Sequence, residues 1–188
     1  ILKILNKSKL KNLKYFLFSS SSHVYKPSFA KLTENSKRIP VNAYGKSKKQ
    51  AEDFIINNKK IFRFKIGIAR IFNFYSKDHK DGFFIYDLIK KLKSTNKNIH
   101  LKRINTVRDF ININQLCDIL NFMIIKKIGM PLNIGSSKGL NLIDLSKMII
   151  KKKRIKKNII FEKKIYPGFN SNINLLRKLG YKKKIIQF

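Results

Sequence analysis

Lys14-Tyr-Phe-Leu-Phe18 leads directly into Ser19-Ser-Ser-Ser22-His23-Val24-Tyr25. The first run is short and apolar and ends at serines, which predicts a buried β-strand followed by a loop that continues to Asn42. The pattern from Ala43 to about Lys59 predicts a helix, and Phe64-Lys-Ile-Gly-Ile-Ala-Arg70 predicts a second strand. Two strands joined by a long helix form a βαβ unit, so the sequence predicts a parallel sheet and an α/β fold.

Helices and strands continue to alternate toward the C-terminus. The spacing of apolar residues predicts helices at Phe83–Lys93, about Asn114–Lys126 and Asn141–Lys152, and strands at Val107–Ile113 and Pro131–Ile134. Asn158–Phe161 and Asn172–Leu179 are expected to complete a smaller C-terminal lobe, and residues 1–10 fit the end of an amphipathic helix.

The composition is that of a globular protein with an unusual charge. Of 188 residues, 43% are hydrophobic, 43 are Lys or Arg and 10 are Asp or Glu, which gives a formal net charge of +33. Such a charge is typical of nucleic-acid-binding proteins, but a nucleic-acid footprint gathers on one face. Lys, Ile and Asn are instead abundant throughout this chain. We therefore interpret the charge as background composition, with a polyanion-binding module as the rival interpretation.

The single cysteine and the lack of long apolar runs exclude several classes of protein. Cys117 alone allows no internal disulfide and no cysteine-based zinc site, and no metal site is predicted. Because it lies in the apolar stretch Leu116–Phe122, we expect a small buried hydrophobe rather than a reactive thiol. No run approaches the roughly 20 apolar residues that span a bilayer, and residues 1–7 are too broken by charge for a signal peptide. We expect a soluble cytoplasmic protein.

Tyr44-Gly-Lys-Ser-Lys48 is the strongest indication of function. Positions i and i+4 of a helix share a face, so Tyr44 and Lys48 are expected to project side by side. An ammonium beside a phenol favours the phenolate and makes the pair a proton donor and acceptor. Ser21, at the end of the preceding strand, can then hydrogen-bond the oxygen of an alcohol or ketone. The alternative is an aromatic residue that packs on the core beside an exposed lysine.

Further blocks with a recognisable order follow along the chain. They are Leu32-Thr-Glu34, Pro40, Arg70-Ile-Phe-Asn-Phe-Tyr75, Val107-Arg-Asp-Phe-Ile111, Asn133-Ile-Gly-Ser136 and Leu176-Arg-Lys-Leu-Gly-Tyr181. Together with Phe18–Tyr25 and Ala43–Lys48, they resemble the extended short-chain dehydrogenase/reductases. The most similar branch is the NAD-dependent epimerase/dehydratase family that acts on nucleotide sugars. The resemblance runs from about residue 12 to residue 182.

The resemblance implies the C-terminal part of a Rossmann-type, doubly wound parallel sheet with a small α/β substrate-binding lobe. Residues 1–75 are expected to form a partial Rossmann domain that carries the active site. Residues 76–188 are expected to form mainly the substrate-binding lobe, with segments that return to the main sheet. The implied cofactor is NAD or NADP and the implied partner is a nucleotide-diphosphate sugar. The helix that carries Tyr44 is implied to form a homodimer interface.

The resemblance also implies roles for individual residues. Tyr44 is expected to be the general acid/base, Lys48 to hold the nicotinamide ribose, and Ser21 to orient the substrate hydroxyl. The expected cofactor contacts come from Ser19, Ser20, Tyr44, Lys48, Ile71 and Phe72. The expected substrate contacts come from Ser21, Ser22, His23, Asn73 and Arg108.

Three of these residues have alternative interpretations that the sequence leaves open. Asn73 could instead cap a loop. Arg108 is suited to a phosphate or ribose because its guanidinium is forked, but it could instead form a salt bridge with Asp109. His23 either moves a proton at a sugar carbon or is a loop histidine that contacts cofactor or solvent.

The sequence departs from the family pattern in three places. The family begins with a glycine-rich G-x-x-G-x-x-G turn that lets the backbone reach the cofactor pyrophosphate, and no such spacing exists here. The chain therefore resembles an N-terminally truncated member, and an inactive fragment is the alternative to an enzyme. Ser22 and His23 stand where family dehydratases have an acidic pair, so 4-epimerisation or 4-keto reduction is favoured over dehydration. Lys26 replaces the glycine that usually follows Val-Tyr.

Overall fold

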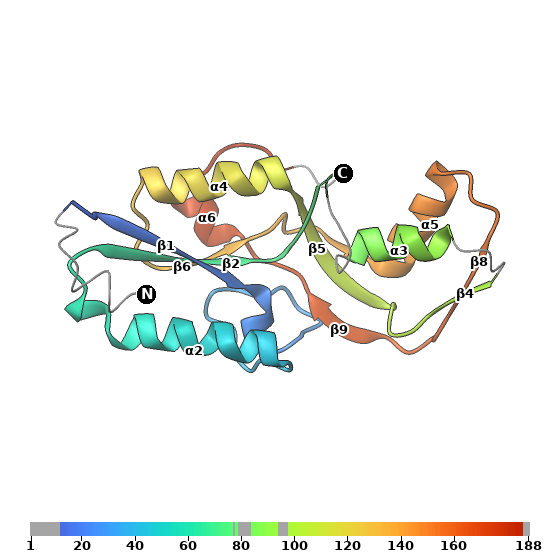
Figure 1. Ribbon diagram of the computed structural model, residues 1–188, viewed down its shortest axis with the longest axis horizontal. Coiled ribbons are helices and arrows are strands. Elements are labelled where there is room, and N and C mark those ends of the chain that lie inside the picture. The colour runs from blue at the N-terminus through green and yellow to red at the C-terminus, as the bar shows by residue number, and fades with distance from the viewer. Residues whose placement is uncertain (1–11, 77, 79–83, 94–97, 186–188) are drawn as a thin grey trace.

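A parallel three-stranded sheet forms the centre of the molecule. The structure is a computed structural model that describes residues 12–76, 78, 84–93 and 98–185, so the helix expected at residues 1–10 lies outside the described residues. The sheet contains β1 (Tyr15–Ser21), β2 (Lys65–Ile71) and β6 (Pro131–Ile134) in the order β1-β2-β6. Figure 1 shows these strands side by side between two layers of helices.

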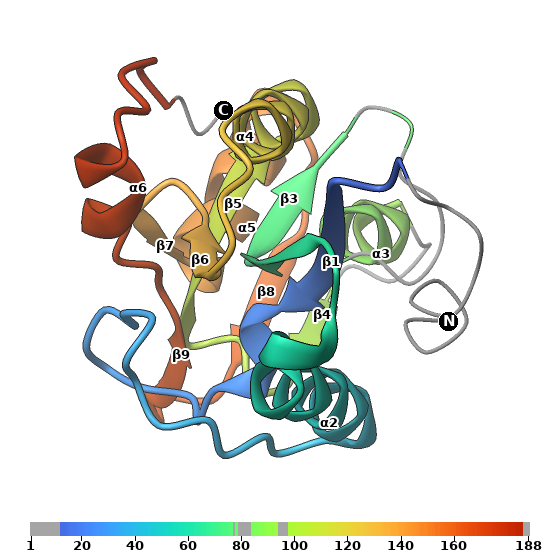
Figure 2. The same ribbon diagram turned by 90° about the vertical axis from the view of Figure 1, so that its left-hand side faces the viewer.

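Helices cover both faces of this sheet. The long α2 (Ala43–Asn57) lies on one face, whereas α4 (Ile113–Ile125) and α6 (Asn174–Lys178) lie on the other (Figures 1 and 2). Alternation along β2 explains both layers, because successive side chains of a strand point to opposite faces. Ile66 and Ile68 pack with Ile55 of α2, while Ala69 packs in the cluster under α4 and α6.

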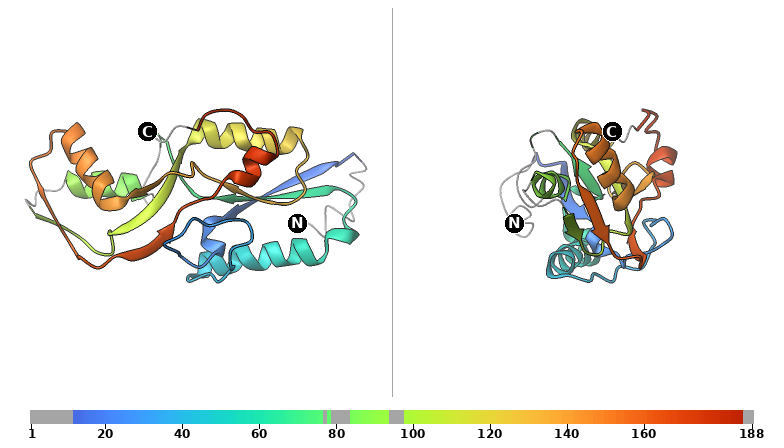
Figure 3. Two further views of the ribbon diagram at one scale, coloured as in Figure 1. Left: turned by 180° about the vertical axis from the view of Figure 1, so that it is seen from behind. Right: turned by 90° about the vertical axis from the view of Figure 1, so that its right-hand side faces the viewer.

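A second, mixed sheet links this centre to a smaller lobe. Its central strand is β5 (Thr106–Asn112), which pairs in parallel with β3 (Asn73–Tyr75) and β9 (Tyr166–Phe169) and antiparallel with β7 (Gly139–Asn141). Beyond it lie α3, α5 and a two-stranded parallel sheet of β4 and β8, seen from behind in Figure 3. The bounds of these outer elements are Phe84–Leu92 for α3, Leu142–Lys152 for α5, Asn98–Leu101 for β4 and Asn158–Phe161 for β8.

The α/β fold with a parallel Rossmann-type sheet, predicted from the sequence, is confirmed, and most predicted elements form within two residues of their expected bounds. Phe83, expected to open a helix, lies outside the described residues. The strands β3, β4, β7 and β9, each of three or four residues, were not predicted. The division of the chain at residue 75 stays a prediction, although β6 pairs with β2 in the central sheet.

The extent of the first strand was predicted wrongly. A strand ending at Phe18 and a loop starting at Ser19 were expected, but β1 continues to Ser21 and a short 3₁₀ helix, Ser22–Val24, follows. Ser19 and Ser20 pair with Ala69 and Arg70 of β2. Pairing with a strand distant in the sequence outweighs the low β-propensity of serine.

The expectation of a buried Cys117 was also wrong, because its side chain is exposed. The buried residues of α4 are Leu116, Ile119 and Met123, which recur at helical spacing on one face. Cys117 directly follows Leu116 and therefore projects from another side of the helix. Across the described ranges, no helix is long and apolar enough to cross a membrane.

A buried ion pair joins α2 to β2. Glu52 of α2 is 0% exposed and Arg70 of β2 is 2% exposed. The Arg70 Nε donates to both carboxylate oxygens at 3.0 and 3.1 Å, and a terminal nitrogen donates to Glu52 Oε2 at 2.7 Å. Although burial alone acts in the opposite direction, hydrogen bonds to Glu52 raise the pKa of Arg70. The two side chains therefore form a geometrically well-matched salt bridge.

Replacing Arg70 by Met should destabilise the protein by about 3–5 kcal/mol, because Glu52 would remain buried without its cation. Urea-induced unfolding of the variant and the wild-type protein measures this difference. Arg38→Met is the matched control, since Arg38 also contacts Glu52, at 3.3 Å, but is partly exposed. The control should lose about 1 kcal/mol or less. Equal losses in the two variants would show that burial of the pair is not the cause.

Candidate active site

The catalytic candidates gather where β1 ends and α2 begins. Ser21 is the last residue of β1, and Asn42 caps α2 by accepting a hydrogen bond from the Gly45 N–H at 2.7 Å. The Asn42 side chain also lies 3.0 Å from Nδ1 of His23. A Cβ atom at Gly45 would lie 2.1 Å from the His23 carbonyl oxygen, so only glycine permits this close approach. The start of α2 is thereby held against the residues that follow β1.

Tyr44 and Lys48 share a face at this end of α2, as the sequence predicted. The Lys48 ammonium donates to the Ser19 carbonyl at 2.8 Å and lies 5.7 Å from the centroid of the Tyr44 ring. The Tyr44 side chain is not packed in the core, because the residue is 53% exposed. Lys48 is thus tied to β1, and the phenol beside it is open to a ligand.

The serines at the end of β1 have different environments. Ser21 is buried, and its hydroxyl oxygen accepts from the His23 N–H at 3.2 Å; within the described chain its own hydroxyl hydrogen has no acceptor. The Ser20 hydroxyl donates to Glu52 at 2.5 Å, so its hydrogen is not available to a cofactor. Ser22 is buried, and its carbonyl accepts from the Tyr25 N–H. Ser21 is therefore the serine best placed to donate to a substrate oxygen.

His23 connects this cluster to the second sheet. Its ring lies 5.9 Å from the Tyr44 ring and 4.9 Å from the ring of Phe169, at the end of β9. Burial, and then the nearby charge of Arg108, lower the pKa of His23 from its ordinary value of 6.5. The imidazole is consequently neutral at neutral pH, and one of its nitrogens can accept a hydrogen bond.

Arg108 and Asn73 come from neighbouring strands of the second sheet. The Arg108 guanidinium lies 5.0 Å from the centroid of Phe169, and burial lowers its pKa. The alternative salt bridge with Asp109 does not form, because the buried Asp109 carboxylate instead accepts hydrogen bonds from residues 136, 137 and 171. The Asn73 amide donates to the Asp109 carbonyl at 3.2 Å, which links β3 to β5.

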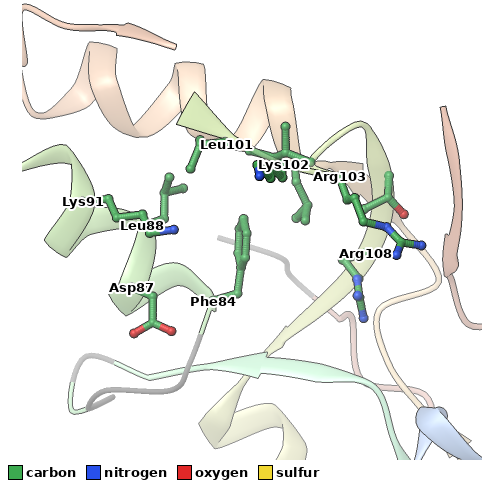
Figure 4. A pocket seen from close by; sticks show the side chains of 11 residues that line it. Phe84, Asp87, Leu88, Lys91, Leu101, Lys102, Arg103 and Arg108 are labelled. Atoms are coloured by element: carbon green, nitrogen blue, oxygen red, sulfur yellow. The ribbon is translucent and has the colours of Figure 1, made fainter. Parts of the chain in front are cut away.

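Two cavities adjoin these residues. One, of about 290 Å³, is lined by His23, Asn42 and Phe169, among others. The other, of about 320 Å³, lies in the smaller lobe, and Figure 4 shows the Phe84 ring pointing into it. Both are lined by Arg103, Thr106 and Arg108, so they meet at β5. Each lies near the lower limit of the volumes usual for small-molecule sites, about 300–1,000 Å³.

The sequence did not indicate Arg103, Tyr166 or Phe169 as site residues. Arg103 lies at the turn between β4 and β5, and the two aromatic residues are the ends of the unpredicted β9. The only signal was the pattern Tyr166-Pro-Gly-Phe169, which brings two aromatic residues to one short segment. Their proximity to Arg103 and Arg108 depends on pairing between β5 and β9.

The residues expected to hold a nicotinamide cofactor fit only one end of it. Ser19, Tyr44 and Lys48 surround the end of β1, and Ile71 and Phe72 follow at the end of β2, where the Phe72 N–H is bonded to Ile134. In the described ranges, no strand leads into a glycine-rich turn, and β1 pairs with β2 alone. The groups suited to the nicotinamide ribose are present, whereas a diphosphate cradle is not among them. The same ranges hold no cluster of metal-ligating side chains.

The lowered pKa of His23 predicts a pH dependence of stability. Because the unfolded chain binds a proton at this residue more readily, the contribution of the neutral imidazole is complete above about pH 6.5 and is lost as the pH falls toward the folded-state pKa. His23→Gln should therefore flatten the decline of the unfolding free energy below about pH 6.5, as measured by urea unfolding at several pH values. His100→Gln, which removes an exposed imidazole from β4, should retain the wild-type slope. If the unfolding free energy of His23→Gln declined with pH as steeply as that of the wild-type protein, His23 would not be a cause of the decline.

Comparison with curated proteins finds enzymes of nucleotide-linked sugars. The chain is 29% identical over 135 residues to GDP-6-deoxy-D-talose 4-dehydrogenase of Aggregatibacter actinomycetemcomitans, covering 69% of this chain and 45% of that protein. It is 36% identical over 67 residues to UDP-arabinose 4-epimerase 1 of Arabidopsis thaliana, covering 35% of this chain and 16% of that protein. The chain thus spans less than half the length of these relatives.

Solved structures share the fold. The Pseudomonas aeruginosa protein RMD, determined with NADPH, superimposes with a TM-score of 0.80 at 19% identity, covering 92% of this chain and 62% of that one. The dTDP-glucose 4,6-dehydratase of Bacillus anthracis, determined with NAD, gives a TM-score of 0.78 at 19% identity, covering 92% and 57%. The family model "NAD dependent epimerase/dehydratase family" matches residues 1–135. Since this match includes most of the chain and its Ser21, Tyr44 and Lys48 cluster, the protein belongs to the NAD-dependent epimerase/dehydratase family.

Proposed function

We propose that the protein that contains this chain is an NAD(P)-dependent nucleotide-sugar 4-epimerase or 4-keto reductase. The observation that carries the proposal is the position of Tyr44, exposed at the start of α2 beside Lys48, which is anchored to Ser19. Both curated relatives have names that refer to position 4 of a nucleotide-linked sugar. The family and the local geometry therefore favour the same reaction class.

Tyr44, Lys48 and Ser21 have different roles in the proposed proton transfer. The Tyr44 phenolate removes the proton of the C4 hydroxyl during oxidation, and the phenol returns a proton to the oxygen during reduction. Lys48 stabilises the phenolate, and the Ser21 hydroxyl donates a hydrogen bond to the same substrate oxygen. A bound nicotinamide cofactor supplies the hydride acceptor and donor for this step.

The environment of Tyr44 favours epimerisation or reduction over elimination of water. Elimination requires an acid and a base at neighbouring sugar carbons, in addition to the phenol. Ser22 and His23 occupy the positions at which family dehydratases carry an acidic pair. Neither serine nor histidine has a carboxylate, Ser22 is in addition buried, and the lowered pKa of His23 leaves its imidazole uncharged at neutral pH.

The cavities suggest how a nucleotide sugar lies. The sugar fits the cavity beside His23, which is the one nearer to Tyr44. The nucleoside fits the cavity in the smaller lobe, where Phe84, Leu88 and Leu142 provide apolar surface for a base. Arg108 lies where the two meet, so it is placed to bind the diphosphate between them.

Tyr44→Phe should reduce turnover by about 10²–10⁴-fold, because it removes the group that transfers the proton. The measurement uses the full-length protein with NAD⁺ or NADP⁺ and a panel of UDP- and GDP-sugars, with the 4-epimers separated by chromatography and reduced cofactor followed by absorbance. Affinity for the nucleotide sugar, measured by calorimetry, should change less than about threefold.

Tyr86→Phe is the matched control, because it removes a partly exposed phenol from α3 in the smaller lobe. It should keep wild-type turnover. Wild-type turnover in Tyr44→Phe would refute the mechanism, and a protein without turnover on any sugar of the panel would favour the inactive-fragment alternative.

A further inference from the structure

Two arginines mark the place where the two cavities meet. Arg103 lies at the turn between β4 and β5, and Arg108 lies within β5; both line both cavities. Figure 4 shows them on the same side of the Phe84 ring, opposite Leu88 and Lys91. A ligand that occupies both cavities would therefore contact the residues that line both, which include these two guanidinium groups.

Each arginine is stacked on an aromatic residue of β9. The Arg103 guanidinium lies 4.9 Å from the centroid of Tyr166, and the Arg108 guanidinium lies 5.0 Å from the centroid of Phe169. The pairing of β5 with β9 places Thr106 opposite Tyr166 and Arg108 opposite Phe169, so the two stacks follow one another along the same pair of strands. Stacking on a ring orients a planar guanidinium and leaves its N–H groups free to donate.

Neither arginine has a carboxylate partner in the part of the chain that the structure describes. Two neighbouring cations that lack counter-ions repel each other, and partial burial adds a further cost to the charge of Arg108. An anionic ligand removes this cost. Forked guanidinium groups match phosphate oxygens, and two of them match two linked phosphates better than one.

The backbone at Arg103 has an unusual conformation. Its φ angle is 53°, in the left-handed region that residues other than glycine and asparagine rarely adopt. Two other cations, Lys127 and Arg154, have similar angles, but each directly follows the C-cap of a helix, where a left-handed residue is common. Arg103 instead lies in the turn between β4 and β5, and its side chain lines both cavities.

We propose that Arg103 is a second diphosphate-binding residue that acts together with Arg108 and makes the site selective for nucleoside diphosphates over monophosphates. The proposal deepens the proposed function and rests on it for the identity of the ligand. Arg108 alone would hold a single phosphate in either class of ligand. Arg103 adds the contact that only a second phosphate can use.

Isothermal titration calorimetry with UDP, GDP, UMP and GMP tests the proposal on the full-length protein. The wild-type protein should bind its preferred diphosphate at least tenfold more tightly than the corresponding monophosphate. Arg103→Ala should weaken diphosphate binding about tenfold or more and change monophosphate binding less than threefold. Arg103→Gly, which accommodates the positive φ angle, should give the same result if the alanine variant folds poorly.

Arg154→Ala is the matched control, because it removes another exposed arginine with a positive φ angle, at the end of α5 and outside both cavities. It should leave diphosphate binding within threefold of the wild-type value. Equal affinities of the wild-type protein for diphosphate and monophosphate would overturn the proposal. So would an Arg103→Ala variant that behaves like Arg154→Ala.

The outcome is separable from the test of the proposed function. Loss of diphosphate selectivity in Arg103→Ala supports the inference even if Tyr44→Phe has wild-type turnover, which would refute only the catalytic mechanism. Conversely, a Tyr44-dependent turnover with an unchanged KM in Arg103→Ala refutes only the role of Arg103. A raised KM for the nucleotide sugar with an unchanged kcat is the expected kinetic result.

Discussion

The buried pair of Glu52 and Arg70 is the interaction on which the position of the active site depends. Arg70 also donates to the Tyr25 hydroxyl and to the Glu34 carbonyl, each at 2.8 Å, and Tyr25 in turn donates to Asn133 of β6 at 2.7 Å. One network thus connects α2, β2, β6 and the loop that follows β1. Because desolvating two charges is costly, the pair is stable only with these additional hydrogen bonds. They fix α2, and with it Tyr44, relative to the end of β1.

The distribution of acidic residues indicates why so basic a chain still folds. Several of its 10 carboxylates occupy positions where no lysine could replace them. Glu52 and Asp109 are completely buried and accept hydrogen bonds from the segments they join, while Asp53 lies between Arg38 and Lys49. Most lysines instead lie at exposed or partly exposed positions, where exchanging one polar residue for another changes the stability little. Background composition as the origin of the net charge stays a prediction.

Short sequence patterns predicted those features that depend on residues close together in the chain. The spacing of Tyr44 and Lys48 was sufficient to place them on one helical face, and the apolar run at Ile66–Ala69 was sufficient for a central strand. Pairing between distant segments could not be predicted in this way. The pairing of β5 with β9, which brings Tyr166 and Phe169 to the arginines, joins residues about 60 positions apart, and β9 alone has no strand-like alternation. Glu52 could not be distinguished from the other charges of α2 without knowing that it faces Arg70.

The two halves of the site are connected through side chains in contact rather than through the backbone alone. The Tyr44 ring lies against His23, His23 against Phe169, and Phe169 against Arg108, so a row of planar groups leads from the proposed proton-transfer residue to the proposed phosphate-binding residues. The positive charge of Arg108 disfavours the imidazolium of His23, and a bound anion would oppose that effect. The proposed binding of a diphosphate at the arginines would therefore be linked to the protonation of His23. Since His23 lies between Arg108 and Tyr44, occupancy of the proposed phosphate site would change the electrostatic environment of the Tyr44 phenol.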